Sequence, residues 1–122
     1  MATFDRFEEL EVWKLSMELC INIYELTNAD VFSKDYALKD QIRKSAISVP
    51  SNISEGFERD AKKQFIYFLV ISKGSCGELR TQLKIAEKLK YVSETNFIAL
   101  NEKCISVSKQ LSGFINYLKN KN

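Results

Sequence analysis

The chain contains no histidine. This absence excludes serine–histidine–aspartate and cysteine–histidine catalysis in their usual forms, because both use an imidazole as the base. It also excludes the di-iron sites of helical bundles, which need Glu-x-x-His pairs. Cys20, Cys76 and Cys104 are too widely spaced for a zinc site and suit small buried hydrophobic positions. We therefore predict that the protein is not an enzyme and has no catalytic residue, metal site or cofactor.

Proline and glycine are also scarce, with one proline and four glycines in 122 residues. So few chain-breaking residues favour a small number of long elements. No stretch shows the sustained alternation of apolar and polar residues that is typical of a strand. Gly74 and Gly77 lack the neighbouring residues of a phosphate-binding loop, and close approach of another helix is their expected role. These patterns predict an all-α protein.

Long apolar runs are missing as well. No segment reaches the roughly 18 consecutive apolar residues of a transmembrane helix, so we expect no membrane partner. The acidic start of the chain differs from the basic and then apolar layout of a signal peptide. An odd number of distant cysteines argues against a disulfide framework. We expect a cytoplasmic protein with a single domain, residues 1–122.

Four segments carry apolar residues at steps of three and four, the spacing of one helical face. Since the connections are short, they predict an antiparallel up-down four-helix bundle. The predicted helices are Phe7–Thr27, Ala37–Glu55, Ala61–Lys90 and Glu94–Lys119. We expect a loop over residues 28–36 and helix caps at Asp60 and Ser93. Gly56 suits a left-handed conformation just after the second helix.

Two core seams are regular enough to predict residue by residue. The second helix is expected to bury Ile42, Ala46, Val49 and Ile53. The last helix has an unbroken seam with the spacing of a helical bundle. Its members are Phe97, Leu100, Cys104, Val107, Leu111, Phe114 and Leu118.

Pro50 falls inside the second helix. It has no N–H, so the carbonyl of Ala46 loses its partner, and we predict a bend there without a break. The hydroxyls of Ser45 and Ser48 are near enough to help satisfy the freed carbonyls. A polar row beside the core has two interpretations, a hydrogen-bond network that fixes helix register and a polar pocket. The row comprises Gln41, Ser45, Ser48, Asn52 and Glu55, opposite Ser72, Ser75 and Glu78.

An apolar run of seven residues, Phe65 to Ile71, exceeds what one core-facing stripe needs. Several of its members point away from the core arc, and the first helix also has an unusually wide apolar face. Exposed apolar patches of this kind mark interfaces, so we predict self-association. The alternative is that the loop 28–36 folds over the run. The predicted interface residues are Ile66, Tyr67, Val70, Trp13 and Met17.

Basic residues follow one side of the third helix. Lys62, Lys73, Arg80 and Lys84 lie within about 40° of one another at 100° per residue, with Lys88 nearby. A nucleic-acid backbone is a natural partner for this basic stripe. The alternatives are a solvated face and docking on the first helix of a neighbouring copy, since the first 32 residues hold seven acidic and two basic side chains. The further candidate contacts are Arg43, Lys44 and Arg59.

Three sequence segments resemble one protein family. They are Phe7–Trp13, the stretch Gln41–Gly56 with its proline between Ser-Val and Ser-Asn-Ile, and Phe65–Ala86. The chain looks like the four-helix-bundle proteins encoded in intervening sequences of bacterial 23S ribosomal RNA genes, which are often labelled S23 ribosomal proteins. A related branch is the accessory variability protein of diversity-generating retroelements. The resemblance implies ring-like pentamers. In the retroelement branch it also implies binding of a reverse transcriptase and of nucleic acid through a basic surface.

Taken together, the patterns and the resemblance predict a homo-oligomeric helical protein that binds RNA or DNA through the basic stripe. Structured RNA is the preferred partner in this hypothesis, and a partner protein such as a reverse transcriptase is a further expectation. The competing hypothesis is an assembly scaffold that works through protein contacts alone.

Overall fold

The computed structural model describes residues 4–121, with the backbone alone at Asp30. Helices account for nearly all of this range, and no strand occurs within it. The elements are a 3₁₀ turn η1 (Phe7–Glu9) and five α-helices: α1 (Glu11–Thr27), α2 (Asp30–Lys34), α3 (Tyr36–Glu58), α4 (Lys62–Lys88) and α5 (Glu94–Asn120). The predicted all-α class is confirmed.

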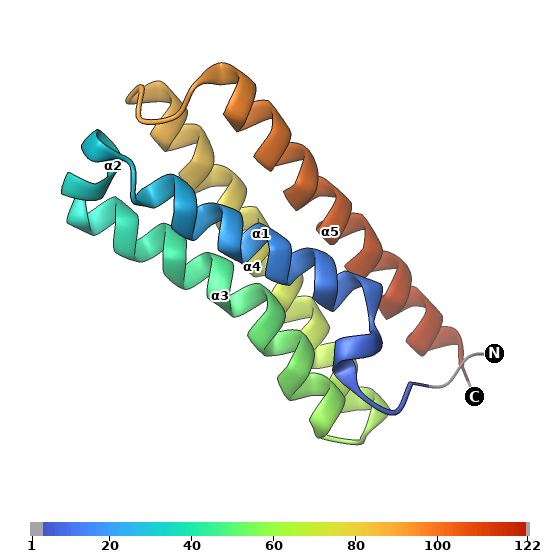
Figure 1. The fold of residues 1–122 in the computed structure, drawn as a ribbon. Coiled ribbons are helices and arrows are strands. Elements are labelled where there is room, and N and C mark those ends of the chain that lie inside the picture. Colours follow the sequence, from blue (N-terminus) through green and yellow to red (C-terminus); the bar gives the residue numbers. More distant parts are fainter. Residues whose placement is uncertain (1–3, 122) are drawn as a thin grey trace.

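The four long helices run alternately up and down along one bundle (Figure 1). Helix α3 packs between α1 and α4, and α5 packs between α4 and α1, so each long helix has two neighbours. Both ends of the described chain lie at the same end of the bundle (Figure 1). At that end the Lys62 ammonium donates to the carbonyl of Lys121 over 2.6 Å. The arrangement is the antiparallel up-down bundle that the sequence predicts.

The core seams match the predicted periodicity with one shift. All four predicted residues of α3 are buried. In α5, Ile115 is buried while the predicted Phe114 is only half-buried, as is Phe97. A straight α-helix drifts about 20° per heptad against a strict seven-residue repeat, so the buried stripe moves to the neighbouring position near the helix end. The buried residues of α5 are Leu100, Cys104, Val107, Leu111, Ile115 and Leu118.

The first predicted helix is interrupted near its start. Leu10 is extended, with φ −74° and ψ 125°, and separates η1 from α1. The Glu9 carboxylate accepts from the backbone N–H groups of Asp5 and Arg6, each over 3.0 Å, which holds the turn closed. Leu10 itself is buried. The chain therefore changes direction at this residue so that its side chain can enter the core.

The connection between α3 and α4 differs from the prediction at two residues. Gly56 does not follow the helix in a left-handed conformation; it lies inside α3, which continues to Glu58. Asp60 takes the left-handed conformation instead, with φ 54°, which Asp tolerates better than most residues. It is therefore not the cap of α4; Ala61 occupies that position without a side-chain hydrogen bond. Ser93, by contrast, caps α5 as predicted by accepting from the N–H of Asn96 over 3.1 Å.

The segment expected to be a loop, residues 28–36, contains the short helix α2. Its Phe32 is fully buried and packs on the Tyr91 ring, with 5.3 Å between ring centroids. The Tyr91 hydroxyl donates to Asp35 Oδ2 over 3.0 Å. Because α2 packs on α1 and α3, it closes one end of the bundle and does not cover the apolar run of α4. The alternative in which this segment hides that run is wrong.

Helix α3 continues through Pro50 without a break, and polar side chains cluster around the proline. The buried Ser72 hydroxyl donates to the Val49 carbonyl over 2.8 Å, and Ser54 donates to the Pro50 carbonyl over 3.0 Å. Ser48 and Ser75 share a hydrogen bond of 2.7 Å between α3 and α4. These contacts are the hydrogen bonds that the network interpretation predicts, although Gln41, Glu55 and Glu78 of the predicted row are exposed. Ser72 and Ser54 bond to the Val49 and Pro50 carbonyls and not to the Ala46 carbonyl that Pro50 frees. Ser48 instead bonds to Ser75 and Asn52, so the predicted help from its hydroxyl is not seen.

Candidate nucleic-acid interface

Three cations of the basic stripe lie in one shallow groove between α4 and α5. Arg80, Lys84 and Lys88 follow one another at four-residue steps, so successive helical turns carry them along one side of α4. Helix α5 supplies Phe97 and Asn101 to the same groove. None of the described residues that line it is acidic. The full lining is Gly77, Arg80, Thr81, Lys84, Ile85, Lys88, Leu89, Phe97 and Asn101.

Local contacts hold two of the three cations, Arg80 and Lys84. Arg80 Nε donates to Asn101 Oδ1 over 3.3 Å, which links the two helices. Lys84 Nζ lies 2.8 Å from a Glu87 carboxylate oxygen and 4.8 Å from the centroid of the Phe97 ring. The Lys84 side chain remains 52% exposed. The Glu87 side chain is 18% exposed, so an incoming phosphate reaches Lys84 from the solvent side and competes with Glu87 for it.

The other members of the stripe are exposed but lie outside the groove. Lys73 is exposed on α4, about one helical turn before Gly77. Lys62 begins α4 at the opposite end of the bundle, next to Lys121. The stripe is therefore interrupted along α4 between Lys62 and Lys73, and only its second half lines a concave surface.

Arg43 does not join the stripe. It lies on α3 with its guanidinium 4.3 Å from the Tyr24 ring centroid of α1. Its Nε donates to Thr27 Oγ1 over 2.7 Å and its Nη2 donates to Asn28 Oδ1 over 2.9 Å. A cation at the C-terminal end of a helix opposes the negative end of the helix dipole. The geometry therefore gives Arg43 a structural task at the end of α1.

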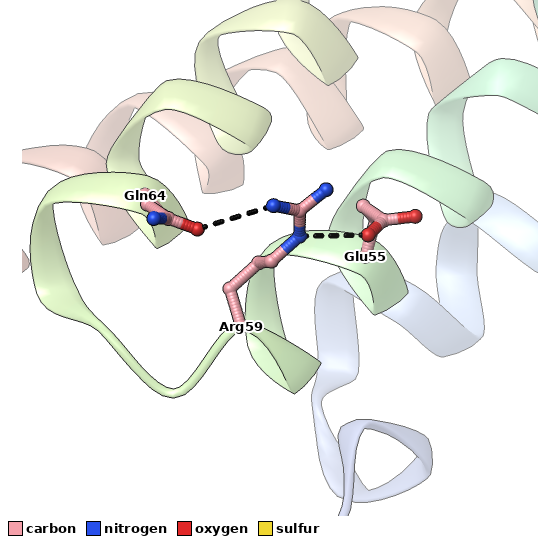
Figure 2. Close-up of polar contacts among 3 residues, drawn as sticks. All are labelled: Glu55, Arg59 and Gln64. Carbon is pink, nitrogen blue, oxygen red and sulfur yellow. Dashed lines mark hydrogen bonds and ion pairs between the residues drawn. The ribbon is translucent and has the colours of Figure 1, made fainter.

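Arg59 also lies apart from the groove, at the turn between α3 and α4. Figure 2 shows its guanidinium between two partners, with Nε 2.9 Å from Glu55 Oε2 and Nη1 3.4 Å from Gln64 Oε1. The same guanidinium lies 5.0 Å from the Phe68 ring centroid. Lys44 is exposed on α3, next to Arg43. The candidate contacts Arg43, Lys44 and Arg59 thus all lie outside the groove between α4 and α5.

Phe97 and Asn101 were missed by sequence reasoning as groove residues. The seam pattern predicts Phe97 in the core, whereas the structure has it half-buried, packed against the core and also lining the groove. Asn101 gives no signal of its own, because only the pairing of α4 with α5 brings it to Arg80. Only the periodic basic residues of α4 could be predicted from the sequence as members of this site.

The predicted interface residues fall into two separate apolar patches. Tyr67 and Val70 are 61% and 52% exposed on α4, while Ile66 is half-buried and packs against the core. Trp13 and Met17 line a shallow apolar hollow between α1 and α3, where Trp13 Nε1 donates to Ser54 Oγ over 3.0 Å. Tyr67 and Val70 belong to α4, whereas the hollow lies between α1 and α3, so the two patches are on different helices.

The cysteines are buried in the core. Burial raises the pKa of the Cys76 thiol to about 11 and that of Cys104 to about 12. Both groups are therefore protonated at neutral pH and are poor nucleophiles and metal ligands. Within residues 4–121, no group of His, Cys, Asp and Glu side chains is placed to hold a metal ion. No helix in this range is long and apolar enough to cross a membrane.

Comparison with known proteins assigns the family. Residues 8–113 match the family model described as 23S rRNA-intervening sequence protein. A search of curated proteins finds no match. The fold is similar to a crystal structure of a protein with unknown function from the S23 ribosomal protein family of Bacteroides thetaiotaomicron. The TM-score is 0.78 at 23% identity, and the match covers 85% of this chain and 97% of that one. The chain belongs to the 23S rRNA-intervening sequence protein family.

Proposed function

We propose that the protein is a non-enzymatic, homo-oligomeric bundle that binds nucleic acid, with structured RNA as the preferred partner. The observation that carries this proposal is the convergence of Arg80, Lys84 and Lys88 in a groove whose described lining contains no carboxylate. Nucleic-acid phosphates release condensed counterions when cations replace them, which supplies sequence-independent affinity. The groove between α4 and α5 is the proposed binding surface, with Lys73 and Lys62 extending it along α4.

The test is a charge-removing variant with Arg80, Lys84 and Lys88 all changed to Gln. Binding of a structured RNA should weaken strongly at low salt. The slope of log affinity against log salt should become shallower by about two to three, because each lost phosphate contact removes somewhat less than one unit. Fluorescence anisotropy over a salt series measures both quantities.

A matched control removes three lysines outside the groove, by Lys14→Gln, Lys34→Gln and Lys119→Gln. Each of these side chains is exposed, and the loss of net charge is the same. The control should bind RNA nearly as well as the parent. If both triple variants lost the same RNA affinity, the effect would come from net charge and not from the groove. If the groove variant lost no RNA affinity, the proposal would be contradicted.

Self-association is supported by the two apolar patches. A contact between different patches on successive copies is heterologous, and such contacts form rings when the rotation closes. The ring-like pentamer implied by the family resemblance is the assembly we expect. Light scattering should give a particle several times larger than the 14.1 kDa chain. Val70→Asp or Met17→Asp should shift it towards the monomer, whereas a 14.1 kDa parent would refute the claim.

The second candidate function is a scaffold that uses protein contacts alone. It is favoured by the acidic first helix, where Glu11, Glu18 and Glu25 are exposed and complement the basic stripe. On this hypothesis, the triple Gln variant of the groove dissociates the oligomer. On the nucleic-acid hypothesis, it lowers RNA affinity and leaves the particle mass unchanged.

A partner protein such as a reverse transcriptase belongs to the proposal only through the retroelement branch of the resemblance. The genomic neighbourhood separates the branches. A ribosomal RNA gene around the coding sequence supports the intervening-sequence branch, and a neighbouring reverse transcriptase gene supports the other.

A further inference from the structure

Apolar side chains line the same groove as the three cations. Ile85 is 44% exposed and Leu89 is 50% exposed, although both are large hydrophobic residues. The half-buried Phe97 adds an aromatic ring from α5. A surface that served only to attract phosphates would gain nothing from these three side chains, because phosphate binding needs charge and hydrogen-bond donors.

The mixture fits an unpaired nucleotide better than a base-paired helix. A duplex turns its phosphates and sugars outward and keeps the faces of its bases stacked inside. An unpaired segment exposes base faces that stack on aromatic side chains while the adjoining phosphates contact cations. Resting on the proposed nucleic-acid function, we infer that the groove binds an unpaired segment of RNA. One base lies against Phe97, and the neighbouring phosphates lie on Arg80, Lys84 and Lys88.

Lys84 regulates access to the ring in this arrangement. Its ammonium lies 4.8 Å from the Phe97 centroid while it pairs with Glu87. A phosphate that draws Lys84 away from Glu87 also uncovers the ring face for a base. Lys84 is 52% exposed but Glu87 only 18%, so the incoming phosphate has to offset the loss of the Lys84 partner by a partly buried carboxylate. Phosphate binding and base stacking are therefore coupled through one side chain.

Asn101 gives the groove an uncharged polar group beside the ring. Its Oδ1 accepts from Arg80 Nε, which fixes the orientation of the side-chain amide. An amide in this position can hydrogen-bond to the edge of a base that is no longer paired. Gly77 and Thr81 are the small members of the lining, and a Cβ at Gly77 would meet nothing within 4 Å. That side of the groove is open to a ribose-phosphate chain.

The experiment compares three RNAs with equal numbers of phosphates: an unpaired strand, a hairpin that carries the same bases in its loop, and a blunt duplex. The full-length protein should bind the first two about tenfold more tightly than the duplex, since stacking of one base is worth roughly that factor. Phe97→Leu should abolish the preference and leave duplex affinity and its salt slope unchanged. Tyr117→Leu, another partly exposed aromatic residue of α5, is the matched control and should retain it.

A 2-aminopurine base in the unpaired strand reports stacking directly. Its fluorescence should be quenched on binding to the parent protein and to Tyr117→Leu, and not on binding to Phe97→Leu. If Phe97→Leu impairs folding, the test rests on 2-aminopurine fluorescence with the parent protein. Absence of quenching on binding to the parent overturns the inference. Equal affinity for duplex and unpaired RNA overturns it as well.

The two proposals fail in different ways. If the triple Gln variant of the groove loses affinity for all three RNAs while Phe97→Leu changes nothing, the nucleic-acid function stands and the unpaired-base inference is wrong. If the triple Gln variant binds every RNA as the parent does, the function proposed for the groove fails and the inference fails with it.

Discussion

At Gly56, a missing side chain sets how closely α3 and α4 approach. A Cβ at this position would lie 2.8 Å from Phe68 Cβ and 3.2 Å from the Phe65 carbonyl oxygen. The first of these neighbours is close to the backbone, and the second belongs to it, so neither can swing aside. Glycine is unfavourable in a helix interior by about 1 kcal/mol relative to alanine. Its presence inside α3 is explained by contact with α4 rather than by helix termination.

The substitution Gly56→Ala should therefore destabilise the protein. Overpacking of this kind lowers the free energy of unfolding by about 1–3 kcal/mol, which exceeds the gain in helix propensity. Gly113→Ala is the control, because a Cβ at Gly113 would meet nothing within 4 Å. It should be neutral or stabilising in urea denaturation. Equal stability of the two variants would contradict this account of Gly56.

Arg43 offers a second test at the scale of one residue. Arg43→Gln removes the guanidinium from Thr27, Asn28 and the end of α1, and should lower the free energy of unfolding by about 1–2 kcal/mol. The salt slope of RNA binding should not change. Lys44→Gln, at the adjacent exposed lysine, should leave stability unchanged. Loss of RNA affinity in Arg43→Gln at unchanged stability would instead place Arg43 in the binding surface.

At the scale of an element, α4 supplies polar groups to the part of α3 that contains Pro50. The Ser72 hydroxyl reaches the Val49 carbonyl, and the Ser48–Ser75 pair fixes the register of the two helices one turn away. Both contacts lie at the interface that buries the seam of α3. The segment of α3 around Pro50 is thus held by a helix that is distant in sequence.

Ser72→Ala tests this support. It removes the hydroxyl that donates to the Val49 carbonyl in a fully buried position, which should lower the free energy of unfolding by about 1–2 kcal/mol. Ser51→Ala, on the exposed side of α3, is the control and should change stability little. Thermal unfolding of both variants measures the difference. A Ser72→Ala protein as stable as the parent would show that the carbonyl needs no donor there.

The interiors of the helices could be predicted from sequence, as could the end of α1 at Thr27 and the start of α5 after Ser93, but the turn between α3 and α4 could not. Ile42, Val49 and Ile53 repeat at the spacing of one face, and this local pattern survives in the bundle. The sequence predicts Gly56 as a helix terminator because glycine commonly ends helices, whereas its close approach to Phe68 is a tertiary contact that no local pattern signals. The left-handed Asp60 is likewise selected by the turn that two packed helices require.

At the scale of the whole molecule, the candidate site depends on the pairing of α4 with α5. The spacing of Arg80, Lys84 and Lys88 could be predicted from one helix, because charge periodicity is local. The placement of Phe97 and Asn101 beside them could not, since it depends on which helix lies next to α4 and at what height. The same holds for the two apolar patches, which one amphipathic pattern could not distinguish from a single surface.

Global stability should also fall in alkaline solution. Burial holds the Cys76 and Cys104 thiols in the neutral form and raises each pKa from 9.0, to about 11 and about 12 respectively. In the unfolded chain both ionise near pH 9, so their contribution is complete below pH 9 and is lost as pH rises towards the folded values. Each thiol contributes a slope of about 1.4 kcal/mol per pH unit in that range. A Cys76→Ala, Cys104→Ala double variant should show a shallower decline in urea denaturation, and an unchanged decline would contradict the assignment.

The shared location of the two chain ends has a practical consequence for the proposed groove. Lys62 and Lys121 meet at one end of the bundle, whereas Arg80, Lys84 and Lys88 lie in the second half of α4, towards the other end. A fluorescent protein or an affinity tag attached at either end would therefore project away from the RNA site. The same proximity suits a circular permutant in which a short linker joins residue 121 to residue 4 and new ends open in the α4–α5 turn. In such a permutant the chain ends would lie beside the groove, and a label attached there would obstruct RNA binding.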